Sequence, residues 1–127
     1  YFHGENRGDV VLFAHTAIDA GADVLLGHGP HVPRAVELYQ QRIIAYSLGN
    51  FCTTLGINVA GKNGLAPILS INIDQKGQFK SGKIISARQR RPAGPLIDKQ
   101  ISLIPGLKLM QPAILKLKRR LKINTRI

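Results

Sequence analysis

Histidines are the residues of this sequence best suited to chemistry. His28 and His31 stand three residues apart, and Pro30 stiffens the turn between them. A neutral imidazole is a good ligand for Zn, Mn, Fe, Ni or Co, so two in a stiff turn can point at one metal ion or at two neighbouring ions. The same spacing also arises by chance, and buried histidines are often simply hydrogen-bonded. Spacing alone leaves both interpretations open.

A third histidine and a carboxylate lie near the first residue. His3 follows Tyr1-Phe2, which is interpreted as the end of a strand. His28 follows an apolar run that is interpreted as a second strand. Ligands of α/β sheets bind at the carboxyl ends of parallel strands, so parallel neighbours would bring both imidazoles to one rim. Glu5 is a candidate metal ligand, histidine partner or proton donor. His15 falls on the polar side of a predicted helix and is interpreted as a surface residue.

A helix and a strand are expected to position these residues. Asp9 suits an N-cap, and apolar residues follow it with helical spacing, namely Val10, Phe13, Ala14, Ala17 and Ile18. Gly21 is expected to end the helix in a left-handed turn. The apolar run 22–27 predicts a buried strand. Together with Tyr1-Phe2, these elements predict a βαβ unit with a parallel pair.

Antiparallel hairpins are predicted after this unit. Residues 35–39 and 43–47 favour strands on either side of a turn. Residues 65–73 and 79–87 form a second such pair, which turns at residues 74–77. The predicted fold class is therefore α/β with α+β character, a short parallel start followed by antiparallel hairpins.

Charge is distributed very unevenly along the chain. The net charge is +11; residues 1–75 hold four basic and six acidic side chains, whereas residues 76–127 hold fourteen basic side chains and one acidic one. Residues 89–106 are rich in Pro and Gly and are interpreted as a linker. Residues 107–127 are interpreted as a basic tail, helical by its apolar spacing, although part of it alternates as a strand would.

The basic tail admits several partners. An anionic membrane surface and an acidic polymer both suit it, while nucleic acid is the least favoured because the tail lacks aromatic residues for stacking. A basic face that is simply solvated is an equally good interpretation. No apolar run approaches the about 20 residues that span a bilayer. Cys52 is the only cysteine, so no internal disulfide can form.

Four motifs in order resemble the CapA-type family of bacterial capsule-synthesis and poly-γ-glutamate biosynthesis proteins. They are His3-Gly4-Glu5, the Ile-Asp-Ala-Gly-Ala-Asp run at 18–23, the Gly-His-Gly-Pro-His-Val run at 27–32 and the Tyr-Ser-Leu-Gly-Asn-Phe run at 46–51. The resemblance covers about residues 1–88 and implies the C-terminal part of a calcineurin-like metallophosphatase sandwich. It also implies a role in capsular polysaccharide or poly-γ-glutamate synthesis or export, at the cell envelope.

The resemblance also implies a metal site. His3, His28 and His31 match residues that help to hold two metal ions, of Mn, Zn or Fe, which would polarise a phosphoryl group of a phosphate-containing substrate. Glu5 and Asn50 become the candidate catalytic residues, and Asn50 would position either a backbone turn or a substrate oxygen.

Tyr46 and Phe51, from the last motif, are interpreted as core residues. Gly29 stands where the family often has another histidine, so the ligand set of this loop stays open.

The family supplies further ligands from an N-terminal half that this sequence does not contain. Because the sequence starts at Tyr1 within a strand-like segment, we expect a C-terminal fragment that is inactive alone. The complete protein is expected to be a metal-dependent phosphoesterase-like hydrolase. Two other classes stay open: a non-catalytic polymer-synthesis component that keeps the fold, and a basic module that binds membrane or nucleic acid.

Overall fold

The computed structural model describes residues 8–52 and 56–98. Tyr1-Phe2, His3, Glu5 and the basic tail 107–127 lie outside the described residues. The elements, in chain order, are α1 (Val10–Asp19), β1 (Val24–Leu26), β2 (Val36–Tyr39), β3 (Arg42–Ala45), the 3₁₀ turn η1 (Gly61–Gly64), β4 (Ile68–Ile73), β5 (Phe79–Ile85), β6 (Ala87–Arg90) and β7 (Gly94–Ile97).

Helix α1 begins and ends where its sequence signals predict. The Leu12 N–H donates to Asp9 Oδ1 at 2.8 Å, which satisfies one of the amide groups that a helix start leaves without a partner. At the other end, the Gly21 N–H donates to Ile18 O at 2.9 Å, and Gly21 has φ 106°. A side chain would be strained at this φ, so glycine ends the helix as predicted.

The central sheet has three strands in the order β1-β3-β2. β2 and β3 form the predicted antiparallel hairpin, joined by Gln40 and Gln41, which have φ 45° and 64°. Positive φ at both positions suits a two-residue hairpin turn. β1 is parallel to β3, with Leu25 opposite Ile44. The described parallel pair is thus β1–β3, whereas the sequence predicted one between residues 22–27 and Tyr1-Phe2.

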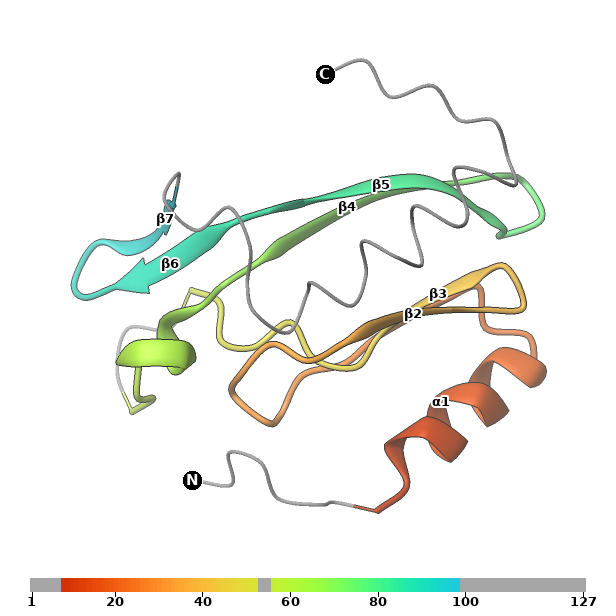
Figure 1. Cartoon of the computed structure of the whole chain (residues 1–127), viewed down its shortest axis with the longest axis horizontal. Coiled ribbons are helices and arrows are strands. Elements are labelled where there is room, and N and C mark those ends of the chain that lie inside the picture. Colours follow the sequence, from red (N-terminus) through yellow and green to blue (C-terminus); the bar gives the residue numbers. More distant parts are fainter. Residues whose placement is uncertain (1–7, 53–55, 99–127) are drawn as a thin grey trace.

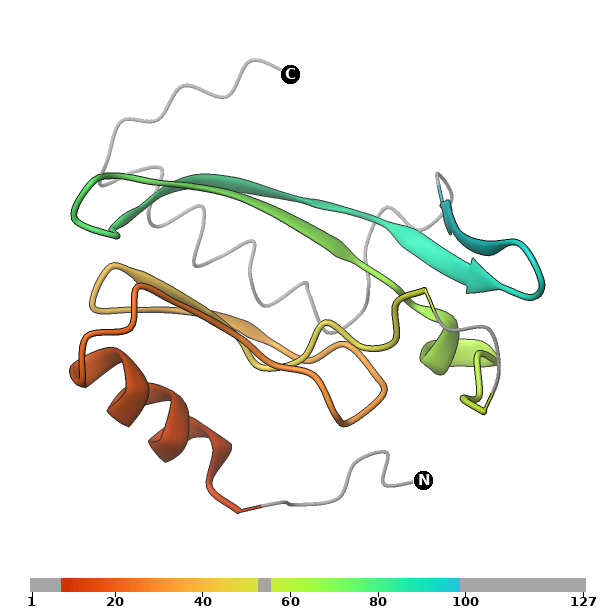
Figure 2. The same cartoon turned by 180° about the vertical axis from the view of Figure 1, so that it is seen from behind.

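The elements are layered. In both Figure 1 and Figure 2, α1 lies against one side of the β1-β3-β2 sheet and the β4–β5 hairpin extends along the other. The core between helix and sheet contains Ala14, Ile18 and Ile44. The partly buried residues that pack on it are Ala22, Leu25, Tyr39 and Tyr46. The fold is therefore a mixed α/β arrangement followed by antiparallel hairpins.

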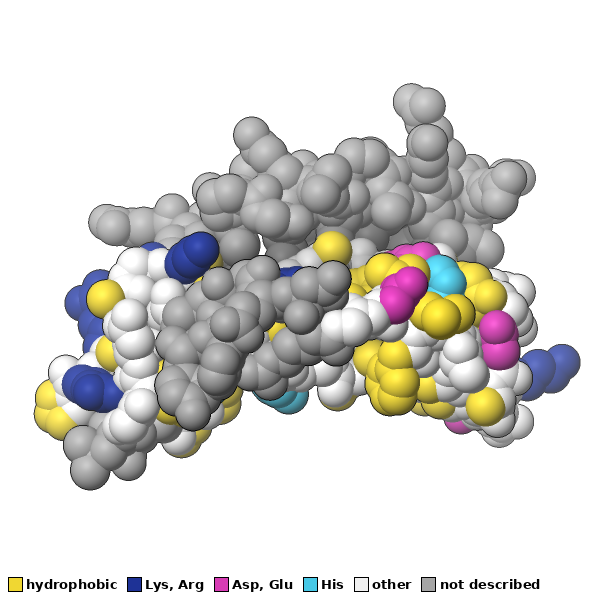
Figure 3. Space-filling view, turned by 90° about the horizontal axis from the view of Figure 1, so that it is seen from below, with side chains coloured by type: hydrophobic (Ala, Val, Ile, Leu, Met, Phe, Trp, Pro, Cys, Tyr) yellow, Lys and Arg dark blue, Asp and Glu magenta, His cyan; other side chains and the backbone are white. Residues whose placement is uncertain are grey.

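The first half of α1 exposes its apolar side chains. Ala14 and Ile18 are buried as predicted, but the exposed fractions of Val10, Val11, Leu12 and Phe13 are 42%, 46%, 64% and 69%. Apolar side chains accordingly cover part of the surface that Figure 3 shows. The prediction that Val10 and Phe13 share the buried face is wrong, because the narrow sheet covers only the second half of the helix.

The later hairpins differ in how well they were predicted. β4 and β5 are antiparallel and turn at residues 74–77, as predicted. β6 and β7 form another antiparallel pair, although residues 89–106 were expected to be a linker. Pro92 lies in the tight turn at residues 91–93 and Gly94 begins β7, and turn residues resemble linker residues in composition. The division into domains stays a prediction. Among the described residues, no helix is long and apolar enough to cross a membrane.

Candidate functional site

Two chain segments meet at the carboxyl ends of β1 and β3. Because these strands are parallel, the loop 27–33 after β1 and the segment 46–50 after β3 leave the sheet at the same rim. Backbone hydrogen bonds continue beyond the strands: the Gly27 N–H donates to Ala45 O at 2.7 Å, and the Leu48 N–H donates to Gly27 O at 3.0 Å. The rim therefore brings together the two motifs that contain His28, His31 and Asn50.

Gly27 allows this close approach. A Cβ at Gly27 would lie 2.3 Å from Tyr46 O, nearer than any side-chain carbon can come to a backbone oxygen. Only glycine therefore lets the first loop run directly beside the segment after β3.

His28 is held by a backbone carbonyl. Its Nδ1 lies 3.1 Å from Gly49 O, and a carbonyl oxygen can only accept. We therefore assign the proton of the neutral ring to Nδ1, which places the lone pair on Nε2.

His31 has the same tautomer for a different reason. Its Nδ1 lies 2.6 Å from Asn50 Oδ1. The amide orientation of Asn50 follows from its other atom: Nδ2 lies 3.2–3.3 Å from the carbonyl oxygens of His31, Asn58 and Asn63, so it must be the donating nitrogen. Oδ1 therefore accepts, the His31 proton is on Nδ1, and the lone pair of the neutral ring is on Nε2.

The backbone at His31 has an unusual conformation. His31 has φ 59°, in the left-handed region that costs a non-glycine residue on the order of 1 kcal/mol or more. Such conformations persist only where the surroundings enforce them, and they concentrate at functional sites.

The described part of the rim provides imidazoles and no carboxylate. Within residues 8–52 and 56–98, no group of three or more His, Cys, Asp and Glu side chains is arranged to hold a metal ion. Two further candidates, His3 and Glu5, lie outside that range, so the three-histidine ligand set and the catalytic role of Glu5 stay predictions. The catalytic role of Asn50 also stays a prediction. By donor chemistry, two imidazoles with Nε2 lone pairs fit a divalent transition metal.

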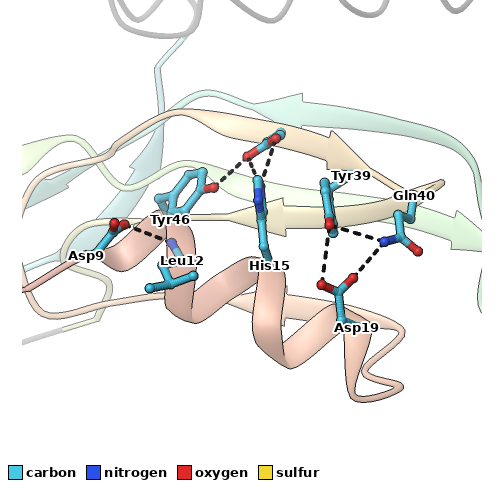
Figure 4. Close-up of polar contacts among 8 residues, drawn as sticks. Asp9, Leu12, His15, Asp19, Tyr39, Gln40 and Tyr46 are labelled. Carbon is cyan, nitrogen blue, oxygen red and sulfur yellow. Dashed lines mark hydrogen bonds and ion pairs between the residues drawn. The ribbon is translucent and has the colours of Figure 1, made fainter.

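A second polar cluster joins α1 to the hairpin (Figure 4). His15 Nε2 lies 3.1 and 3.2 Å from the two carboxylate oxygens of Glu37, and the Tyr46 hydroxyl donates to Glu37 Oε2 at 2.5 Å. The His15 ring stacks on Tyr39 at 3.8 Å between centroids. The interpretation of His15 as a surface residue is wrong, because its ring lies partly buried between helix and sheet. Burial and the hydrogen bond to Glu37 raise the pKa of Tyr46 above its ordinary value.

The same cluster extends to the end of α1. Gln40 Nε2 donates to Asp19 Oδ1 at 2.6 Å, and the Tyr39 hydroxyl lies 3.4 Å from Asp19 Oδ2 (Figure 4). Tyr46 is partly buried, but Phe51 is 48% exposed, so its assignment to the core is wrong.

Sequence reasoning missed the role of Glu37. Its position in a strand of alternating polarity, 22 residues from a helical histidine, was the available signal.

Comparisons with known proteins match the stretch that contains the rim motifs to one family. Residues 5–54 match the family described as "Bacterial capsule synthesis protein PGA_cap". "Capsule biosynthesis protein CapA" of Bacillus anthracis is 55% identical over 38 residues, which are 30% of this chain and 9% of that protein. "PGA biosynthesis protein CapA" of Bacillus subtilis is 53% identical over 38 residues, 30% of this chain and 10% of that protein.

A "Probable polyglutamine synthesis accessory protein" of Mycobacterium tuberculosis is 49% identical over 43 residues, 34% of this chain and 11% of that protein. The matched stretch thus spans about a tenth of the length of these curated relatives.

Proposed function

Since residues 5–54 belong to the PGA_cap family, we propose that this chain contributes part of a metal-dependent, phosphoesterase-like site to the synthesis or export of an anionic capsule polymer. The proposal includes a calcineurin-like metallophosphatase fold for the whole protein. Poly-γ-glutamate and capsular polysaccharide are the polymers that the family resemblance favours.

The common orientation of His28 and His31 is the observation that supports the site most directly. Each ring has Nδ1 against an oxygen that accepts, Gly49 O at 3.1 Å or Asn50 Oδ1 at 2.6 Å. Metal-binding histidines are typically held in this way, with the second ring nitrogen donating to a carbonyl or carboxylate oxygen. Both rings thus have the tautomer that a metal ligand needs, and both lie at the rim where α/β sheets bind ligands.

The metal itself would be a divalent ion of Zn, Mn or Fe. Nε2 of His28 and Nε2 of His31 would hold it, and we expect His3 to complete part of its ligand set. When bound, such an ion supplies a Lewis acid for a phosphoryl oxygen of the substrate. The residues of this chain hold and orient the ligands, and Glu5 is the proposed proton donor.

An anionic partner also suits the charge of the later strands. Among residues 56–98, the basic side chains Lys62, Lys76, Lys80, Lys83, Arg88, Arg90 and Arg91 outnumber the acids Asp74 and Asp98. Such an excess attracts polyanions over distances of about a Debye length. The basic tail 107–127 is proposed to strengthen this attraction, or to bind an anionic membrane surface.

Metal binding by histidine variants tests the proposal. Zn²⁺ and Mn²⁺ are titrated into the purified chain by calorimetry, and bound metal is measured by elemental analysis. His28→Ala and His31→Ala are expected to lower the affinity by at least about tenfold, because each removes a ligand. His15→Gln is the matched control, since His15 contacts Glu37 in the other polar cluster.

Unchanged metal stoichiometry in both rim variants would contradict the proposed site. A parallel assay of phosphodiester hydrolysis separates the two functional classes. Metal binding without turnover in a family member that contains the whole PGA_cap region would favour the non-catalytic polymer-synthesis component.

A further inference from the structure

Asn50 has more polar contacts at the rim than a turn residue needs. Its exposed fraction is 5%, and its single amide group reaches a histidine ring and three backbone carbonyls. We propose that Asn50 is a positioning residue that holds His31 in the metal-binding tautomer and in its left-handed backbone conformation. The proposal rests on the function proposed above for the metal site, and it deepens that function by assigning a role to a residue that need not touch substrate.

The two ends of the Asn50 amide act on the same residue. Oδ1 lies 2.6 Å from the His31 ring at Nδ1, and Nδ2 lies 3.2 Å from the His31 carbonyl oxygen. One rigid, planar amide therefore contacts both the side chain and the main chain of His31. This double contact explains how a histidine with φ 59° keeps both its backbone conformation and its ring orientation.

Asn50 also joins the rim to a later part of the chain. Nδ2 lies 3.3 Å from Asn58 O and 3.2 Å from Asn63 O, and Asn63 belongs to η1. The amide has only two protons for three carbonyl oxygens, so at least one proton is shared. These contacts prevent the Asn50 side chain from turning over, because a flipped amide would place its oxygen against carbonyl oxygens.

Replacing Asn50 with aspartate would separate its two functions, which are to accept from the His31 ring and to donate to the carbonyl oxygens. A carboxylate can accept from His31 Nδ1, but it cannot donate to the three carbonyls. Alanine removes both functions. The pair Asn50→Asp and Asn50→Ala thus distinguishes control of the ring tautomer from support of the loop.

His28 is an internal control in every variant. Its Nδ1 contacts a backbone carbonyl, Gly49 O, which a substitution at Asn50 does not remove. A change confined to the His31 ring shows positioning, whereas equal changes in both rings show that the whole rim has loosened. Ser47→Ala is the matched structural control, because the buried Ser47 Oγ accepts from the Gly49 N–H in the same turn without contacting His31.

The tautomers are read from the ring ¹⁵N chemical shifts of ¹⁵N-histidine-labelled chain, without metal, at a pH where both imidazoles are neutral. The wild type is expected to have the proton on Nδ1 in both rings. Asn50→Ala is expected to move His31 toward the Nε2-protonated form and to leave His28 unchanged. Asn50→Asp is expected to keep the Nδ1-protonated form, and Ser47→Ala is expected to resemble the wild type.

Zn²⁺ affinity is the second readout, with an expected loss of about 10- to 100-fold for Asn50→Ala and a smaller loss for Asn50→Asp. A wild-type His31 ring protonated on Nε2, or an unaltered His31 tautomer in Asn50→Ala, overturns the assignment even if metal binds. Absence of Zn²⁺ binding by wild type overturns the proposed function instead, and the tautomer result still decides the role of Asn50. If Asn50→Ala does not fold, the wild-type and Asn50→Asp tautomers decide.

Discussion

The Tyr46 hydroxyl donates a 2.5 Å hydrogen bond to Glu37 Oε2, and this bond connects the segment after β3 to the neighbouring strand β2. The same carboxylate accepts from His15 on α1. Glu37 is therefore the point at which the helix, the hairpin and the start of the rim segment are joined. Any change that removes the hydrogen bonds between this carboxylate and its two partners should therefore affect the stability of all three elements.

Alkaline pH should lower the stability of the fold through ionisation of Tyr46. Burial and the bond to Glu37 raise the pKa of Tyr46, so the folded state binds this proton more tightly than the unfolded state does. The stabilisation is complete below the ordinary tyrosine pKa of about 10 and is lost as the pH rises above it. Tyr46→Phe should therefore flatten the fall of unfolding free energy above pH 10, measured by urea titration. Equal slopes for this variant and the wild type would contradict the prediction, and Tyr39→Phe is the control.

Acidic pH should also lower the stability of the fold, through protonation of Asp74. Hydrogen bonds from Lys80 Nζ and from the backbone N–H groups of Gln78 and Lys76 lower the pKa of Asp74 to about 2. Because the pKa is lower in the folded state, the stabilisation is present above the ordinary value of about 4 and disappears as the pH falls toward 2. Asp74→Asn should reduce the loss of stability between pH 4 and 2, followed by guanidinium midpoints. The matched control is Asp23→Asn, which removes a more exposed carboxylate; an identical acid profile in Asp74→Asn would refute the assignment.

Two substitutions at His31 should distinguish the effect of its strained backbone from the effect of losing its ring. His31→Gly and His31→Ala both remove the imidazole, but only glycine adopts φ 59° without strain. We expect the glycine variant to be more stable than the alanine variant by about 1 kcal/mol, and neither to keep the metal affinity of the wild type. Thermal unfolding and Zn²⁺ titration of both variants measure this. An alanine variant as stable as the glycine variant would show that the backbone is not strained.

The two sides of α1 should respond differently to truncation. Ile18 is 6% exposed and packs in the core with Ala14 and Ile44, so Ile18→Ala should cost about 2–4 kcal/mol. Phe13 is 69% exposed, and Phe13→Ala should change the unfolding free energy by less than about 0.5 kcal/mol. Chemical denaturation of the two variants tests the pair. A large cost at Phe13 would mean that its ring is covered in solution.

Local signals in the sequence were enough for the caps and hairpins. Asp9, Gly21 and the turn at 74–77 each act through their immediate neighbours, so residue type and spacing predicted them. The partner of β1 could not be predicted in the same way, because pairing depends on strands that lie far apart in the chain. His15 was misplaced for a similar reason, since only the fold brings Glu37 and Tyr39 to its ring.

The candidate site was predictable as a set of residue types and not as an arrangement. Spacing and family resemblance selected His28, His31 and Asn50. Their hydrogen bonds were not visible in the sequence, because one histidine is held by a backbone carbonyl, which every residue possesses. The roles of His3 and Glu5 rest on the sequence and the resemblance alone.

The two contacts that orient the imidazoles span similar lengths of chain. His28 and Gly49 are 21 residues apart, and His31 and Asn50 are 19 apart. Each doubling of loop length adds only about 0.6 kcal/mol to the entropic cost of closure, and loops of this order close in well under a millisecond. Both histidines and their supports also leave the ribosome within seconds of each other. The rim can thus acquire its ring orientations early during synthesis, before the later hairpins of the chain have been translated.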